Sequence, residues 1–160
     1  MAAEWNSVHP NEVVFSAYLG DFALGKQQFA VAEQQFRKVV ATRPDNAEAL
    51  NNIAFAMVKQ GKPGAVAYAE QALKLRPESP GIMDTLASAL AAEGQLAKAL
   101  GVQRRAVAAN ANDLMLRLDL AKLLLQSGDK SAAQAELKVL EQAGERFPAH
   151  AEVSQLLKSL

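Results

Sequence analysis

The chain contains no cysteine, which excludes disulfides, thiolate catalysis and cysteine-ligated metals within this segment. It has no excess of charge, because 17 Lys and Arg residues are matched by 17 Asp and Glu residues, and a chain without basic excess is a poor candidate for binding nucleic acid. No apolar run approaches the roughly 18 residues that a membrane span requires. The segment 1–10 lacks the basic and apolar stretches of a signal peptide. We therefore expect neither nucleic-acid binding nor membrane contact by this segment.

Aromatic residues are scarce, at 6% of the chain, whereas half of the 160 residues are hydrophobic, mostly Ala and Leu. This composition is typical of helices whose backbones pack closely together. The length is that of one compact domain.

A Leu or Ile followed by a small residue recurs along the chain, and the small residues are 34, 33 and 34 positions apart. A second series of alanines recurs in step with these pairs. A period of this size indicates stacked helix-turn-helix units without a sheet. The pairs are Leu19-Gly20, Ile53-Ala54, Leu86-Ala87 and Leu120-Ala121, and the alanines are Ala32, Ala65, Ala99 and Ala133.

Small residues at these positions allow neighbouring helices to approach closely, since overpacking by larger side chains costs roughly 1–3 kcal/mol. Three of the units have a glycine at the turn between their two helices: Gly61, Gly94 and Gly128. The first unit has Gln27 at this position, so we expect a different turn there.

The pattern resembles the tetratricopeptide repeat, whose period is 34 residues. The resemblance covers nearly the whole chain and includes Pro44 and Pro77 at the ends of repeats. It implies an all-α fold: an α-solenoid of about four helix-turn-helix repeats in a right-handed superhelix, plus a C-terminal capping helix. The sequence departs from the family at its bulky aromatic positions. The early Trp position holds Ser16, Leu50, Met83 and Arg117, and the later Tyr or Phe position holds Phe36, Ala69, Gln103 and Leu137.

The two ends of the array differ. Val153, Leu156 and Leu160 share one face of a C-terminal amphipathic segment, as expected for a cap with a polar outer side. At the N-terminus, Pro10 precedes Pro44 by one period, so the chain is predicted to begin inside a repeat. Residues 1–12 are either the end of a preceding repeat of a longer array or an N-terminal cap in which Trp5 covers the first helix. The remaining segments of this single structural domain are expected to be four repeats at 13–46, 47–79, 80–113 and 114–147, followed by the capping helix at 148–160.

A narrower resemblance is to the C-terminal repeats of the TPR-repeat proteins of the bacterial exosortase/PEP-CTERM system. It rests on the segment 49–54, the short turn at Gly61-Lys62-Pro63, the segment 80–86, Phe147-Pro148 and the closing segment 156–160. Those proteins are exported or lipid-anchored (lipoproteins) and are associated with exopolysaccharide production and protein sorting. The resemblance implies that the parent protein resides in the periplasm or cell envelope, with a cytoplasmic location as the alternative.

Motifs for catalysis are absent from the sequence. The two histidines, His9 and His150, lie near opposite ends of the array, where they cannot share a metal, and no HExxH, P-loop or GxGxxG motif occurs. We expect no enzyme activity, no metal site and no cofactor.

The resemblance implies that the first helices of the repeats line a concave groove that binds a peptide or a helix of a partner protein. Family repeats that grip a carboxylate use a basic clamp, but here Asn52 alone matches it, while Ala17 and Asp21 stand at two of the other positions, so that ligand is not expected. Packing against neighbouring helices is the alternative role, in particular for Phe55 and Leu118. The candidate groove residues are Asp21, Glu48, Asn51, Asn52, Phe55, Lys59, Asp84, Ser88, Met115, Leu118 and Lys122.

These observations predict a non-catalytic scaffold for protein–protein interaction. Two alternatives remain. The exposed end of the array could dock on a second copy and form a homodimer, or the chain could be an accessory or oligomerisation domain of a larger protein that carries an enzyme elsewhere.

Overall fold

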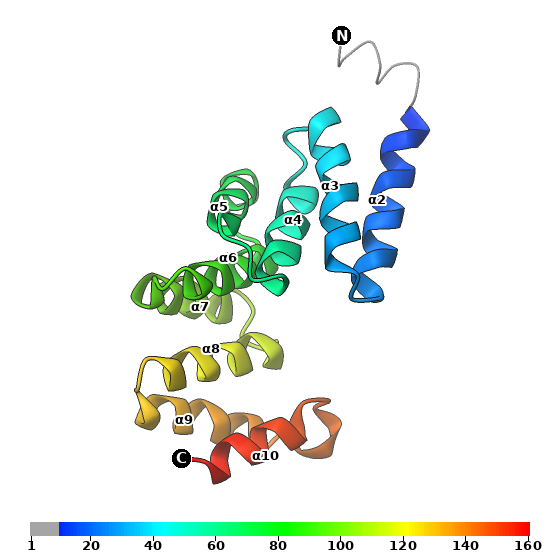
Figure 1. The fold of residues 1–160 in the computed structure, drawn as a ribbon. Helices are drawn as coiled ribbons and strands as arrows, with labels where there is room; N and C mark the ends of the chain where they lie inside the picture. Colours follow the sequence, from blue (N-terminus) through cyan, green and yellow to red (C-terminus); the bar gives the residue numbers. More distant parts are fainter. Residues whose placement is uncertain (1–9) are drawn as a thin grey trace. The chain divides into compact units, whose positions relative to one another are not determined.

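A computed structural model describes residues 10–160. Trp5 and His9 lie outside the described residues. The chain divides into two compact units, of which unit 1 ends at Glu78 and unit 2 runs from Ser79 to Leu160. Nine α-helices and one 3₁₀ helix make up residues 10–160, and no strand occurs in that part of the chain (Figure 1). The predicted all-α repeat fold is confirmed.

Unit 1 consists of two helical hairpins in which each helix packs against the next along the chain. Figure 1 shows α2 and α3 running side by side, with α4 on the other side of α3. The first helix begins at Pro10, three residues before the expected boundary, and whether a repeat precedes it stays a prediction. The helices are α2 (Pro10–Gly25), α3 (Phe29–Thr42), α4 (Ala47–Lys59) and α5 (Ala65–Leu75).

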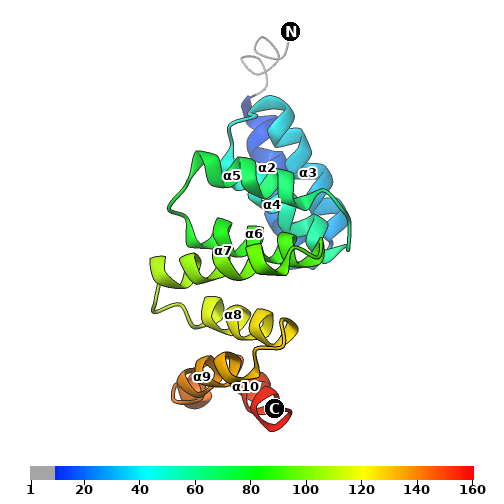
Figure 2. The ribbon, with the colours of Figure 1, turned by 90° about the vertical axis from the view of Figure 1, so that its left-hand side faces the viewer.

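Unit 2 repeats this arrangement and adds one further helix (Figure 2). That last helix packs against the second helix of the fourth repeat and against the preceding 3₁₀ turn, which confirms the predicted capping helix. The elements are α6 (Pro80–Ala92), α7 (Leu96–Ala109), α8 (Leu114–Gln126), α9 (Lys130–Glu141), η1 (Gly144–Arg146) and α10 (His150–Lys158).

Local sequence accounts for several helix ends. The Asn46 side chain accepts a hydrogen bond of 2.9 Å from the backbone N–H of Ala49, so it satisfies one of the unpaired donors at the start of α4. Asp113 caps α8 in the same way, through the N–H of Met115 at 3.0 Å. α3 ends two residues before Pro44, as the proline predicts.

The small residues of the repeat period lie where helices approach most closely. A Cβ atom added to Gly20 would lie 2.7–2.9 Å from ring atoms of Phe36, which is 2% exposed on α3. Ala54 and Ala121 are completely buried, as are Ala99 and Ala133 of the second series. The structure therefore confirms close packing as the reason for the period.

The expectation of a different turn at Gln27 is wrong. Gln27 takes the left-handed conformation, with φ of 56°, close to the 65° of Gly61 at the equivalent turn. The residue after each of these two positions donates its backbone N–H to the carbonyl five residues earlier, as in a Schellman helix end. Packing between α2 and α3 imposes the turn, so Gln27 adopts a backbone conformation that favours glycine. In the four repeats these bonds are Gln28 to Ala23 at 2.8 Å, Lys62 to Met57 at 3.0 Å, Gln95 to Leu90 at 2.8 Å and Asp129 to Leu124 at 3.0 Å.

Candidate functional site

A small pocket opens in unit 1 where residues of α2, α3 and α4 come together. Its volume is about 90 Å³, so it has room for the end of one side chain and not for the 300–1,000 Å³ of a typical small-molecule site. We call it the acidic pocket, because two of its polar lining residues are carboxylates. Its lining is Ala17, Asp21, Phe36, Val39, Asn46, Glu48, Ala49 and Asn52.

The acidic pocket favours a positively charged occupant. Partial burial, and after it the nearby charge of Glu48, raise the pKa of Asp21 above its ordinary value. The negative charge of Glu48 therefore opposes the ionisation of Asp21, and a cation beside the two carboxylates would relieve that repulsion. Of the predicted groove residues, the structure brings together Asp21, Glu48 and Asn52 at this pocket.

The other predicted residues of unit 1 lie farther along α4. The half-buried Phe55 ring packs edge-to-face against Phe29 of α3, with ring centroids 6.1 Å apart. The Lys59 ammonium group lies 5.2 Å from the centroid of the Phe55 ring. Asn51 is also half-buried, and its side-chain amide donates to Asn52 at 3.5 Å. These contacts give Phe55 and Lys59 a structural role while leaving part of each accessible.

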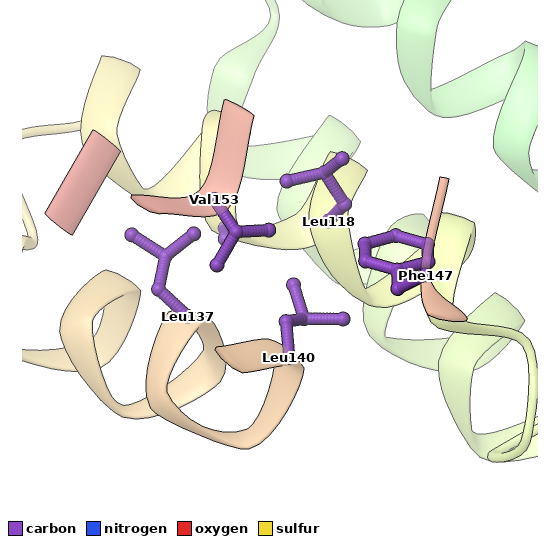
Figure 3. Packing of buried hydrophobic residues seen from close by; sticks show 6 residues of the cluster. Leu118, Leu137, Leu140, Phe147 and Val153 are labelled. Carbon is purple, nitrogen blue, oxygen red and sulfur yellow. The ribbon is translucent and has the colours of Figure 1, made fainter. Parts of the chain in front are cut away.

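Leu118 is not a groove residue. It is completely buried in the core beneath the capping helix, where side chains from α8, α9 and α10 converge (Figure 3). The repeat pattern assigns the position of Leu118 to the groove. The prediction fails because the capping helix covers this position and buries it. The labelled core residues are Leu118, Leu137, Leu140, Phe147 and Val153.

A further candidate in unit 2, Asp84, is held by an internal contact. The Asp84 carboxylate accepts a hydrogen bond of 2.7 Å from the amide of Gln103, which also donates to the carbonyl oxygen of Leu116 at 2.9 Å. Gln103 is 1% exposed and stands at the position where the family pattern has an aromatic ring. Its two hydrogen bonds link α7 to α6 and α8, so polar contacts replace the packing of a ring at this position. Asp84 therefore has a structural role within unit 2.

The Lys122 ammonium group pairs with Glu152 of the cap at 2.9 Å and lies 3.6 Å from Asp119. Ser88 is half-buried, and Met115 is 46% exposed. Of the candidates in unit 2, Met115 therefore offers the most accessible apolar side chain.

The comparisons with known proteins agree with the helical repeat fold. A family model described as tetratricopeptide repeat matches residues 3–146. The chain belongs to the tetratricopeptide repeat family. No curated protein matches the sequence.

Solved tetratricopeptide-type structures share the fold at low sequence identity. A thermophilic TPR protein of Thermus thermophilus superposes with a TM-score of 0.78 at 19% identity, covering 95% of this chain and 84% of its own. A crystal structure of MamA gives 0.70 at 19% identity, covering 94% and 86%. A mutant O-GlcNAc transferase of Thermobaculum terrenum gives 0.76 at 19% identity over 82% of this chain, which spans 26% of the transferase. At these identities the likeness shows the fold alone.

Tetratricopeptide repeats generally mediate protein interactions, and this tetratricopeptide chain carries the corresponding scaffold. Within the described residues, no three His, Asp or Glu side chains are close enough together to hold a metal ion. The helices of residues 10–160 are also too short or too polar for any of them to cross a membrane.

One polar residue of the acidic pocket was not among the residues predicted from the sequence. Asn46 lines the pocket and caps α4. Its place directly before a helix could have indicated the cap, but its contribution to the pocket depends on how α2, α3 and α4 pack together.

Proposed function

We propose that this chain is a non-catalytic protein-binding module whose unit 1 holds a peptide or helix of a partner, with a Lys or Arg side chain of that partner in the acidic pocket. The observation that carries the proposal is the pair of carboxylates, Asp21 and Glu48, at a pocket of side-chain size. A guanidinium or ammonium group would form charge-assisted hydrogen bonds with both carboxylates and with the Asn52 amide oxygen. The partly exposed Phe55 lies on the same helix, where it adds apolar contact area.

A peptide array tests this proposal. Peptides of about twelve residues, each with one central position varied, are probed with the full chain and with an Asp21→Asn/Glu48→Gln variant. We expect the unmodified chain to prefer Lys and Arg at one position. The variant should lose this preference by about thirtyfold or more, since truncating a paired interfacial charge costs about 2 kcal/mol or more.

Glu70→Gln/Glu78→Gln is the matched control, because it removes two exposed carboxylates of unit 1 that do not line the pocket. The proposal is wrong if no basic preference exists, or if the control changes binding as much as the pocket variant does.

We further propose that the parent protein works in a bacterial envelope complex linked to exopolysaccharide export or protein sorting. The support is the resemblance at residues 49–54, 80–86 and 156–160. Antibody detection of the parent protein in fractions of its source cells would test the location, and recovery in the cytosolic fraction alone would contradict it. An affinity pull-down from the envelope fraction would then identify the partner.

The alternative, an accessory domain of a larger enzyme, makes a different prediction. The full-length gene product would then contain a catalytic domain outside residues 1–160, and its sequence would show this directly.

A further inference from the structure

Helix α2 carries an apolar stripe on the side that faces away from α3. Val14, Phe15, Tyr18 and Phe22 recur at spacings of three and four residues, so they share one face of the helix. Their side chains are 62%, 60%, 63% and 53% exposed. The opposite face of α2, which includes Ala23 at 2% exposure, is buried. Figure 1 shows α2 at the edge of unit 1, with α3 on one side of it.

The repeat itself shows what such a face accommodates. Phe15 and Phe22 correspond, one period later, to Ala49 and Ala56 on α4, which are 2% and 0% exposed. In unit 1, α3 packs against α4, just as α7 packs against α8 in unit 2. The surface of α4 that is equivalent to the α2 stripe is therefore buried within the repeat array. On α2 this surface is larger, because two phenylalanines replace two alanines.

We propose that the α2 stripe is an interface for a second copy of this chain, formed by two α2 helices packed antiparallel about a twofold axis beside Tyr18. In this arrangement Phe15 of each copy lies opposite Phe22 of the other, so that aromatic rings pack against aromatic rings at both ends of the contact.

The charges at the two ends of the stripe suit the same arrangement. Glu12 lies in the first turn of α2, and Lys26 follows its last residue, with the ammonium group 5.8 Å from the centroid of the Phe22 ring. Both residues are exposed. An antiparallel pair places Glu12 of each copy opposite Lys26 of the other, whereas a parallel pair would place like charges together.

The other end of the array does not offer a comparable surface. The outer side of α10 carries exposed Glu152, Gln155 and Lys158, and burying these against an apolar stripe would leave charges without water. Head-to-tail stacking of copies is therefore disfavoured relative to the symmetric pair.

The size of the stripe favours a weak dimer over a tight one. The four side chains expose on the order of 400 Å², so a pair would bury on the order of 800 Å² from them, below the ~1,200 Å² typical of stable interfaces. We expect a weak dimer with a dissociation constant on the order of 10–100 µM.

Sedimentation equilibrium of the full chain from about 5 to 500 µM measures this directly. We expect Phe15→Glu to raise the dissociation constant at least tenfold, and the matched control Val139→Glu, which changes an apolar residue of similar exposure on α9, to leave it unchanged. Glu12→Lys should weaken the dimer, and Glu12→Lys/Lys26→Glu should restore it, because the swapped pair has the same complementarity.

Cross-linking tests the direction of the helices. The chain has no cysteine, so Tyr18→Cys introduces a single thiol, which under oxidation should link two copies near the axis. Val14→Cys should not cross-link, since its two copies would be about 13 Å apart along the antiparallel helices.

A chain that stays monomeric to 500 µM overturns the proposal, and the stripe would then belong to a different helix, such as one from an upstream repeat or a separate protein. Failure of the charge swap to restore association, or efficient linking through Val14→Cys, overturns the antiparallel arrangement. Neither result affects the acidic pocket, which is tested separately by peptide binding.

Discussion

Replacing Gln27 with glycine should stabilise unit 1. Gln27 has a φ of 56° at a turn where three other repeats have glycine with φ between 65° and 84°. The left-handed conformation costs a residue with a Cβ atom roughly 1–2 kcal/mol, while glycine loses more chain entropy on folding, by about 0.5–1 kcal/mol. The net gain expected for Gln27→Gly is therefore about 0.5–1 kcal/mol.

The assay is urea unfolding followed by far-UV circular dichroism. Because repeat arrays need not unfold in one step, hydrogen exchange of the α2 and α3 amides provides the local readout. Protection should rise about two- to fivefold in the Gln27→Gly variant, as 0.5–1 kcal/mol implies.

The reverse substitution is the matched control. Gly61→Gln places the same side chain at the equivalent turn, and it should lower the stability of the α4–α5 hairpin by about 1 kcal/mol. The reasoning is refuted if Gln27→Gly is neutral or destabilising, or if Gly61→Gln has no effect, since both outcomes would mean that the backbone conformation does not limit stability at these turns.

Three other substitutions test the packing and the charges. Gly20→Ala should destabilise unit 1 by about 1–2 kcal/mol in urea unfolding, because the new methyl group would meet the buried Phe36 ring at 2.7–2.9 Å. Leu118→Ala should cost about 2–5 kcal/mol in unit 2, because it leaves a cavity in a fully buried core. Glu33→Gln should lower the free energy of unfolding of unit 1 by about 1–2 kcal/mol near neutral pH. This figure already takes into account that solvent screens its partly exposed ion-pair partners. Burial alone would raise the pKa of Glu33, but hydrogen bonds from Lys62, Arg37 and Gln60 outweigh it and lower the pKa to about 2.

The sign of the pH dependence follows from this lowered pKa. The contribution of Glu33 is present above the ordinary glutamate pKa of 4.5 and is lost as the pH falls toward about 2. As the pH is lowered from 4.5 to about 2, the free energy of unfolding should therefore fall in the unmodified chain and fall less in Glu33→Gln. Parallel pH profiles of the two proteins would contradict this assignment.

Matched controls exist for each of these changes. Gly101→Ala adds a methyl group to an exposed helical glycine with open space around it, and it should be neutral or slightly stabilising. Met115→Ala, at a 46% exposed residue of α8, should cost less than 1 kcal/mol. Glu70→Gln should change stability by less than about 0.5 kcal/mol. If a control matches its partner variant, the packing or charge argument for that residue fails.

The sequence predicted the helices well because their signals are local. Pro44 acts through the neighbouring backbone, and the small residues recur at fixed spacing, so stacked helix-turn-helix units could be derived from order along the chain. The caps at Asn46 and Asp113 are equally local but were not predicted. The turn at Gln27 was mispredicted because a local preference was taken to decide a conformation that helix packing imposes.

The candidate site was predicted less well. The repeat register named Asp21, Glu48 and Asn52 among eleven groove candidates, and the structure brings these three together at one pocket that the sequence did not predict. The register failed for Leu118, and it did not show that Lys122 pairs with Glu152 of the capping helix. Both depend on an element that lies outside the repeat.

The period of 33 to 34 residues, by itself, determined that this protein is an all-α repeat array with close-packed helices. Periodic burial follows from the order of residues, because each unit must bury the same face against its neighbour. Which faces stay open was decided by the tertiary structure. The acidic pocket and the exposed stripe of α2 depend on which helices cover which surfaces, and side chains distant in sequence make that choice.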